Sequence, residues 1–134
     1  MSQLKPINLE VNSTPVTYDP NGFPMKDVSE YFDRSSGIPI GFPRIRIKVR
    51  RGNATMDSKV EVQVDLPTLA DTSNSTATGI KPSATRAYNA IGKVEFILPR
   101  QSDESDRQAL IDTVSQLLSK EVMQEAVAQL DFPY

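Results

Sequence analysis

Residues 44–66 read RIRIKVRRGNATMDSKVEVQVDL, and every second residue in residues 44–50 and 59–66 is either charged or polar while its neighbours are apolar. This alternation predicts two β-strands with one buried face each, because successive side chains of a strand point to opposite sides. Gly52, Asn53 and Asp57 between them are typical of a hairpin connection. The stretch therefore predicts an antiparallel sheet with one apolar and one charged face. The apolar face has to be covered from water, and the charged face needs an anionic partner.

The charge of the chain is unevenly distributed. The 134 residues carry 15 basic and 17 acidic side chains, a net charge of −2, so the total does not indicate a nucleic-acid-binding protein. Six basic residues nevertheless lie between residues 44 and 63, against two acids, whereas seven acids and two basic residues follow residue 100. The basic strand is therefore either a solvated face or a contact for an anionic partner.

The composition argues against an enzyme. The chain has no histidine and no cysteine, which removes the usual general base, the usual transition-metal ligands and any Ser-His triad. Asp103, Glu104 and Asp106 are explained more simply as first-turn carboxylates of a helix than as a cation site. We therefore expect no catalytic residue, no metal and no cofactor. No apolar run is long enough for a membrane span, so we also expect no membrane partner.

The N-terminal third predicts short strands. Ile7, Leu9 and Val11 alternate with polar residues before a break at residues 12–15, which indicates a first hairpin. Residues 19–22, DPNG, predict a turn. Val28–Phe32 is interpreted as a short strand, and residues 35–41 as a loop that leads into the basic strand.

The stretch after the central hairpin is irregular. Residues 70–85 are rich in Ser, Thr, Asn and Ala, and a loop of this length is usually functional or disordered. Tyr88–Leu98 then resumes strand character. Gly92 indicates a bulge there, which leaves open whether Tyr88 or Asn89 shares a face with Lys93.

The C-terminal part predicts two amphipathic helices. Ser102 is a good N-cap, and Ser119-Lys120 ends or bends the first helix. Strands followed by helices form an α+β pattern, in which the helices lie on the apolar face of an antiparallel sheet. The apolar positions at helical spacing are Leu110, Val114, Leu117 and Leu118, and then Val122, Met123, Val127 and Leu130.

The order and spacing of these elements resemble the coat proteins of the small single-stranded RNA bacteriophages, the levivirus family. The resemblance covers nearly the whole chain. The residues that carry it are SGIPIG at 36–41, the alternating pair that ends in Leu66-Pro67, TRAY at 85–88 and AQLDFPY at 128–134.

The resemblance implies a single α+β domain over residues 1–134. It would comprise an N-terminal β-hairpin (1–18), a five-stranded antiparallel sheet (26–98) and two C-terminal helices (102–130) that pack across the sheet of a dimer partner. The implied function is that of a structural capsid protein, whose dimers assemble in the cytoplasm of a bacterial host into an icosahedral virion shell around the single-stranded RNA genome. The inward sheet face would also bind an RNA stem-loop, as translational repressor and packaging signal.

The resemblance also implies two sets of site residues. Tyr88 matches the family tyrosine that stacks on an unpaired base, and Glu61 is left out because it would repel phosphate. The implied RNA-binding residues are Arg46, Lys48, Arg50, Lys59, Gln63, Tyr88, Asn89 and Lys93. The implied dimer interface consists of Leu110, Val114, Leu117, Leu118, Val122, Met123, Val127 and Leu130.

A second class of function stays open from the sequence, a dimeric RNA-binding regulator with a sheet platform that forms no shell. The loop at residues 70–85 distinguishes the two hypotheses. A shell would need this loop for contacts around its symmetry axes, so shortening it should stop assembly and leave dimers and RNA binding intact.

Overall fold

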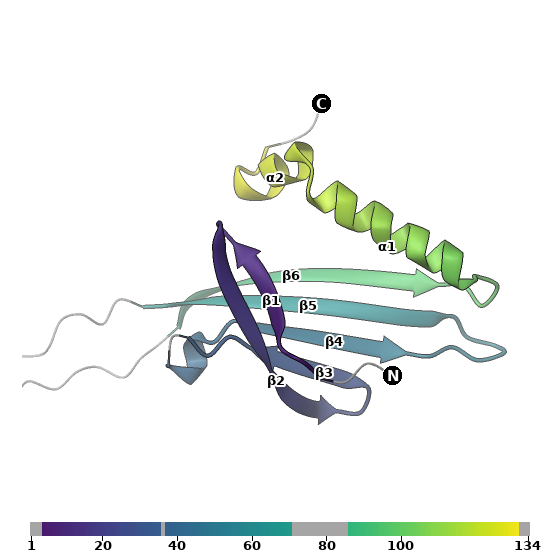
Figure 1. The fold of residues 1–134 in the computed structure, drawn as a ribbon, viewed down its shortest axis with the longest axis horizontal. Helices are drawn as coiled ribbons and strands as arrows, with labels where there is room; N and C mark the ends of the chain where they lie inside the picture. The colour runs from purple at the N-terminus through teal and green to yellow at the C-terminus, as the bar shows by residue number, and fades with distance from the viewer. Residues whose placement is uncertain (1–3, 36, 71–85, 132–134) are drawn as a thin grey trace, which may run out of the picture.

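The computed structural model describes residues 4–35, 37–70 and 86–131, and within them all strands precede the α-helices. This order confirms the α+β prediction. The elements are β1 (Ile7–Val11), β2 (Thr14–Met25), β3 (Val28–Phe32), the 3₁₀ helix η1 (Pro39–Gly41), β4 (Arg44–Arg50), β5 (Ser58–Leu69), β6 (Arg86–Leu98), α1 (Glu104–Leu118) and α2 (Glu121–Ala128) (Figure 1).

Strand β2 takes part in two pairings. Its first part pairs with β1, from Val11 opposite Thr14 to Ile7 opposite Tyr18, and its second part pairs with β3. Strands β3, β4, β5 and β6 follow in sequence order, and each is antiparallel to its neighbour. The six strands form one sheet in the order β1 to β6, one strand more than the five predicted, because β1 joins the sheet through the first part of β2. Strand β1 with this first part of β2 forms the predicted N-terminal hairpin.

The turn predicted at residues 19–22 is wrong. Strand β2 continues through these residues, although its pairing with β3 shifts register between Pro20 and Gly22 and again after Gly22. Pro20 has no backbone N–H that could donate a hydrogen bond to a neighbouring strand. Gly22 has a φ of +95°, a backbone conformation that favours glycine. The same residues that predict a turn therefore bend one long strand out of the hairpin and into the sheet.

The buried core lies where the hairpin crosses the sheet. Tyr18 of β2, Tyr31 of β3 and Ile45 of β4 are buried together, and Tyr31 lies directly opposite Ile45 in the sheet. Burial raises the pKa of the Tyr18 phenol, and the nearby carboxylate of Asp33 raises it further. Partly buried apolar residues surround this cluster: Leu4, Ile7, Val16, Ile47, Val62 and Val64.

The pairing of β5 with β6 is regular over most of its length. It runs without a register shift from Ser58 opposite Leu98 to Thr68 opposite Tyr88. The bulge predicted at Gly92 is therefore wrong, and the irregularity lies between Thr68 and Leu69 instead. Of the predicted loop at residues 70–85, residues 71–85 lie outside the described part of the chain.

The helix boundaries agree with the sequence except at one cap. Asp103, not Ser102, is the N-cap of α1, and it forms a reciprocal capping box with Asp106. The Ser102 hydroxyl instead donates to the carbonyl oxygen of Pro99 at 2.6 Å. Helix α1 ends before Ser119, as predicted, and α2 follows after Lys120.

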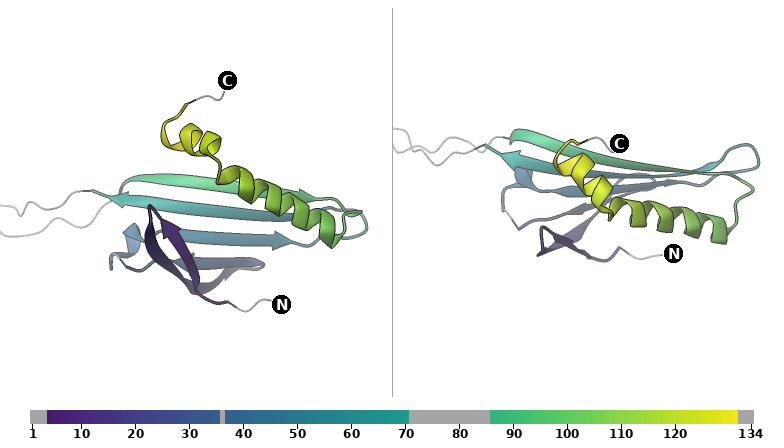
Figure 2. Two further views of the ribbon diagram at one scale, coloured as in Figure 1. Left: turned by 45° about the horizontal axis from the view of Figure 1, so that its top comes forward. Right: turned by 90° about the horizontal axis from the view of Figure 1, so that it is seen from above.

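The helices leave the sheet rather than cover it. Figure 1 shows α1 and α2 beyond the β6 edge of the sheet, and the view from above in Figure 2 shows the helices and the β1–β2 hairpin on the same side of the sheet. No residue of α1 or α2 is buried. Neither helix is long and apolar enough to cross a membrane in the described part of the chain.

Replacing Ile45 by alanine should lower the free energy of unfolding by about 2–4 kcal/mol, because this side chain is only 7% exposed and packs on Tyr18 and Tyr31. Ile97 is 62% exposed and provides the control, and I97A should change the free energy by less than about 0.5 kcal/mol. Urea unfolding at one protein concentration measures both variants. Equal losses in the free energy of unfolding of the two variants would contradict the location of the core around Ile45.

Candidate nucleic-acid interface

The sheet presents one continuous polar face. The register places Lys48 opposite Val28 on β3 and opposite Glu61 on β5, and Gln63 of β5 lies opposite Lys93 of β6. Because side chains alternate along each strand, these positions share one side of the sheet. We call this surface the polar face, and it consists of Val28, Glu30, Phe32, Arg44, Arg46, Lys48, Arg50, Lys59, Glu61, Gln63, Asp65, Asn89, Ile91, Lys93, Glu95 and Ile97.

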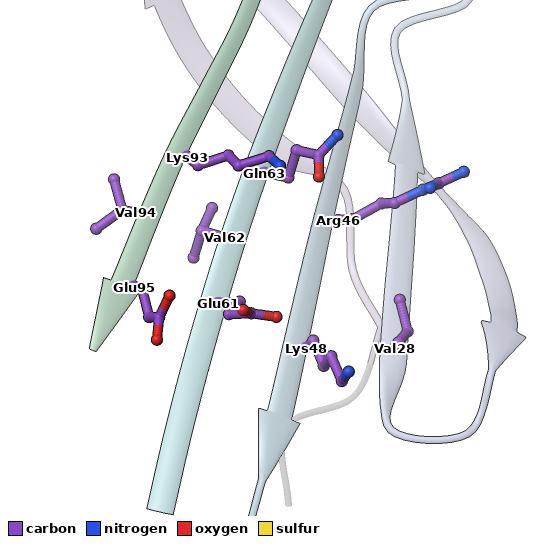
Figure 3. Close-up of a pocket in the computed structure, with 9 residues that line it drawn as sticks. All are labelled: Val28, Arg46, Lys48, Glu61, Val62, Gln63, Lys93, Val94 and Glu95. Carbon is purple, nitrogen blue, oxygen red and sulfur yellow. The ribbon is translucent and has the colours of Figure 1, made fainter. Parts of the chain in front are cut away.

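A shallow pocket lies in the middle of the polar face. Its lining comes from β3, β4, β5 and β6. Figure 3 shows the side chain of Lys93 reaching from β6 towards Gln63 on β5, with Arg46 and Lys48 on the next strand. Three cations and two carboxylates thus surround one hollow: Arg46, Lys48 and Lys93 with Glu61 and Glu95.

Arg46 is held by a buried carboxylate. Its Nε lies 2.7 Å from Oε2 of Glu30, whose side chain is only 6% exposed. The side-chain amide of Asn21 donates to the other oxygen of Glu30 at 3.1 Å, and Arg34 donates to the oxygen of Asn21 at 3.0 Å. Since Glu30 needs this positive charge to remain buried, Arg46 is first of all a structural residue.

Lys59 is also paired with carboxylates. Its ammonium group lies 3.1 Å from both Glu61 and Glu95. Hydrogen bonds to Glu61 and then to Glu95 raise the pKa of Lys59, and the bond from Lys59 lowers the pKa of Glu61. All three groups are exposed enough that solvent screens these interactions.

At the end of the face near η1, Asp65 is the buried acid. Its carboxylate lies 3.8 Å from Nε of Arg44 and accepts a hydrogen bond of 3.0 Å from Gln63. Gln63, a predicted RNA-binding residue, therefore already has a partner in the sheet.

The acids change the interpretation of the basic strand. The polar face carries six basic residues and four acidic ones, because β3, β5 and β6 place acids beside the cations of β4. Among the described residues no carboxylate forms an ion pair with Lys48 or Lys93, although both lower the pKa of Glu61. Within the described ranges, the hydrogen bond from Arg50 goes to a neutral acceptor, the carbonyl oxygen of Asp57 at 3.4 Å. Lys48, Lys93 and Arg50 are thus the cations most available to an anionic partner.

The structure separates Tyr88 from the other predicted RNA-binding residues. Tyr88 lies opposite Thr68, on the side of the sheet that carries Val62 and Val64, whereas Asn89 shares the side of Lys93. Strand alternation therefore directs Tyr88 to the side opposite the polar face, and its part in RNA binding stays a prediction. Asn89 lies on the polar face, and its side-chain oxygen is buried with no hydrogen-bond partner in the described part of the chain.

The residues predicted to form a dimer interface remain accessible in the single chain. Leu117 is 50% exposed, Val127 71% and Leu130 85%, and Val114 and Met123 are half-buried. Ile111, 49% exposed, was not predicted although it stands three residues before Val114 at helical spacing. The helices thus present an apolar surface to solvent.

The described residues contain no group of three or more acidic side chains that could hold a metal ion.

Solved structures share this fold. A chain of the virus-like particle of bacteriophage ESE058 superposes with a TM-score of 0.89 at 24% identity, over 99% of this chain and all of that chain. The subunit of the virus-like particle of Beihai levi-like virus 21 gives 0.84 at 11% identity over 99% of both chains. The capsid protein of bacteriophage GA gives 0.71 at 15% identity, over 94% of this chain and 95% of that one.

The fold is thus the one found in these virus-like particles and in the capsid protein of bacteriophage GA. The sequence profile of the levivirus coat proteins matches residues 2–134, so the chain belongs to the levivirus coat protein family. This confirms the expected resemblance and identifies a structural capsid protein. No curated protein sequence matches the chain.

Replacing Arg46 by methionine should lower the free energy of unfolding by about 2 kcal/mol or more, because it leaves the buried Glu30 carboxylate without its cation. The control is K48M, which removes an exposed ammonium group and should cost less than about 0.5 kcal/mol. Thermal or urea unfolding measures the difference. If both variants were equally stable, Arg46 would not have the structural role assigned to it.

Proposed function

We propose that this chain forms intertwined dimers that assemble into an icosahedral shell around a single-stranded RNA genome. The observation that carries this proposal is the position of α1 and α2, which extend past β6 with no buried residue. Membership of the levivirus coat protein family supports the shell, and so does the fold shared with subunits of virus-like particles.

The dimer follows from two exposed features that lie side by side. Strand β6 is 13 residues long and has a neighbour only on the β5 side within the described sheet. A long unpaired edge is prone to pair with another strand. If β6 of two copies pair, the helices of each copy reach the apolar side of the other sheet, which carries Val60, Val62, Phe96 and Leu98.

The polar face is the surface we assign to RNA. It lies on the side of the sheet opposite the core and the hairpin, so the helices of a partner would leave it open. Lys48, Lys93 and Arg50 would contact phosphates, which contributes affinity that falls as salt rises. Glu61 and Glu95 keep the net charge of the face low and limit nonspecific attraction.

The same face would bind an RNA stem-loop that represses translation and marks the genome for packaging, with assembly in the cytoplasm of the bacterial host. Of the eight predicted RNA-binding residues, seven lie on the polar face, and Tyr88 does not. A folded RNA presents phosphates and unpaired bases together, so it can use both the cations and the amide of Asn89.

Replacing Leu117 by aspartate tests the dimer. In an isolated chain this side chain is half-exposed, and the substitution would change little. If the partner covers Leu117, the new carboxylate would be buried without a partner, and we expect no particles in electron micrographs and a loss of soluble protein. Q116D, which adds the same charge at an exposed position on the opposite side of α1, provides the control and should give normal particles. Normal particles from L117D would contradict the proposed interface.

Replacing Lys48 and Lys93 together by glutamate tests the RNA face. Arg46 is left intact because its removal would affect folding. We expect particles or dimers of normal size with a clearly lower ratio of absorbance at the nucleic-acid and protein maxima, since two phosphate contacts become repulsive.

The charge-matched control for this variant is K5E together with K120E, at exposed positions away from the polar face. It should leave the RNA content unchanged. An RNA content of the K48E/K93E particles equal to that of the wild type would overturn the assignment of RNA to the polar face.

A further inference from the structure

The polar face carries an aromatic cluster at the end of β3. The ring centroids of Phe32 and Phe42 are 5.9 Å apart and the ring planes make an angle of 53°. The guanidinium carbons of Arg34 and Arg44 lie 6.0 Å and 5.8 Å from the centroid of the Phe32 ring. One half-buried ring on the polar face therefore has two cations beside it.

Phe32 is the aromatic residue that the strands β3 to β6 place on the polar face within the described part of the chain. It lies opposite Arg44, in the same alternation that puts Glu30 opposite Arg46 and Val28 opposite Lys48. Tyr88, the aromatic residue that the sequence suggests for base stacking, lies on the other side of the sheet. Any stacking of an RNA base on this face therefore has to use a ring other than that of Tyr88.

One of the two arginines, Arg34, forms no ion pair in the described part of the chain, and the other, Arg44, is paired with a single acid. Arg34 is exposed and donates to a neutral acceptor, the side-chain oxygen of Asn21 at 3.0 Å. Arg44 forms an ion pair with Asp65 at 3.8 Å, and its Nε is buried with no hydrogen-bond partner among the described residues. A planar base can stack on a phenyl ring or on a guanidinium plane, and its phosphate can meet the remaining positive charge.

We propose that Phe32, together with Arg34 and Arg44, forms a stacking site for an unpaired nucleobase of RNA at the edge of the polar face. This proposal rests on the proposed function, because the RNA has to lie on that face. The hydrogen-bonded Asn21 fixes Arg34 beside the ring, and the continuous row of Arg44, Arg46 and Lys48 on β4 leads from the stacking site to the central pocket.

Tryptophan fluorescence tests the stacking directly. The chain has no tryptophan, so F32W introduces a single reporter at the proposed site, and Y88W introduces one on the opposite face. RNA-free protein is titrated with oligoadenylate and with an oligomer of the same length that lacks bases. Anisotropy of end-labelled oligoadenylate reports binding independently.

We expect oligoadenylate to quench the emission of F32W and to leave that of Y88W unchanged, and the abasic oligomer to quench neither. F32L provides a second variant in case F32W does not fold. It should bind oligoadenylate about tenfold more weakly than the wild type does, because the aromatic ring is removed, and it should bind the abasic oligomer with wild-type affinity.

Two results would overturn the stacking site alone: normal binding of labelled RNA with unchanged F32W emission, or an F32L variant with wild-type affinity for oligoadenylate. Quenching of Y88W in place of F32W would return the stacking role to Tyr88. A wild-type protein that bound neither oligomer would overturn the assignment of RNA to the polar face, and this proposal with it.

Discussion

The constraint on which the structure depends is that a single chain cannot cover its own apolar surfaces. Helix α2 has only eight residues, and helices of this length are marginal in water without packing. Yet Leu117, Val122 and Val127 are half-exposed or more, and full burial of such a side chain contributes about 1.5–3 kcal/mol. The apolar side of the sheet near β6 is likewise left without helices from its own chain (Figure 1). A second copy that pairs along β6 would cover both surfaces at once, and shell formation would build on that dimer.

The polar face shows how a sheet combines positive charge with stability. A row of cations on one strand would repel itself, but the antiparallel register sets Glu30 beside Arg46 and Asp65 beside Arg44, while Lys59 lies between Glu61 and Glu95. The two buried acids, Glu30 and Asp65, hold Arg46 and Arg44 in fixed positions. Lys48 and Lys93 remain without an ion pair in the described part of the sheet. The face is thus divided into residues that fix its geometry and residues that are available for phosphate.

Local patterns in the sequence predicted the strands and helices. The pairing register between strands that are distant in sequence determines which residues share the polar face. The alternation in residues 44–66 predicted β4, β5 and their faces, because strand period is a local property. The role of Glu30 was not predictable, since its partner Arg46 is 16 residues away and only the β3–β4 register brings them together. The resemblance assigned Tyr88 to RNA, and the bulge suggested by Gly92 left open on which face it lies; the β5–β6 pairing contains no bulge there and places Tyr88 opposite the polar face. At residues 19–22 the turn-forming residues bend a strand because β2 has partners on both sides of the bend.

The most direct test of this account is the molar mass and absorbance ratio of the protein expressed alone, measured by size-exclusion chromatography with light scattering. The account predicts that no folded single chain persists and that the protein elutes as dimers or as megadalton particles that contain nucleic acid. A stable, folded monomer at micromolar concentration would contradict it, because the apolar surfaces of α1, α2 and the sheet would then be stable in water without a partner.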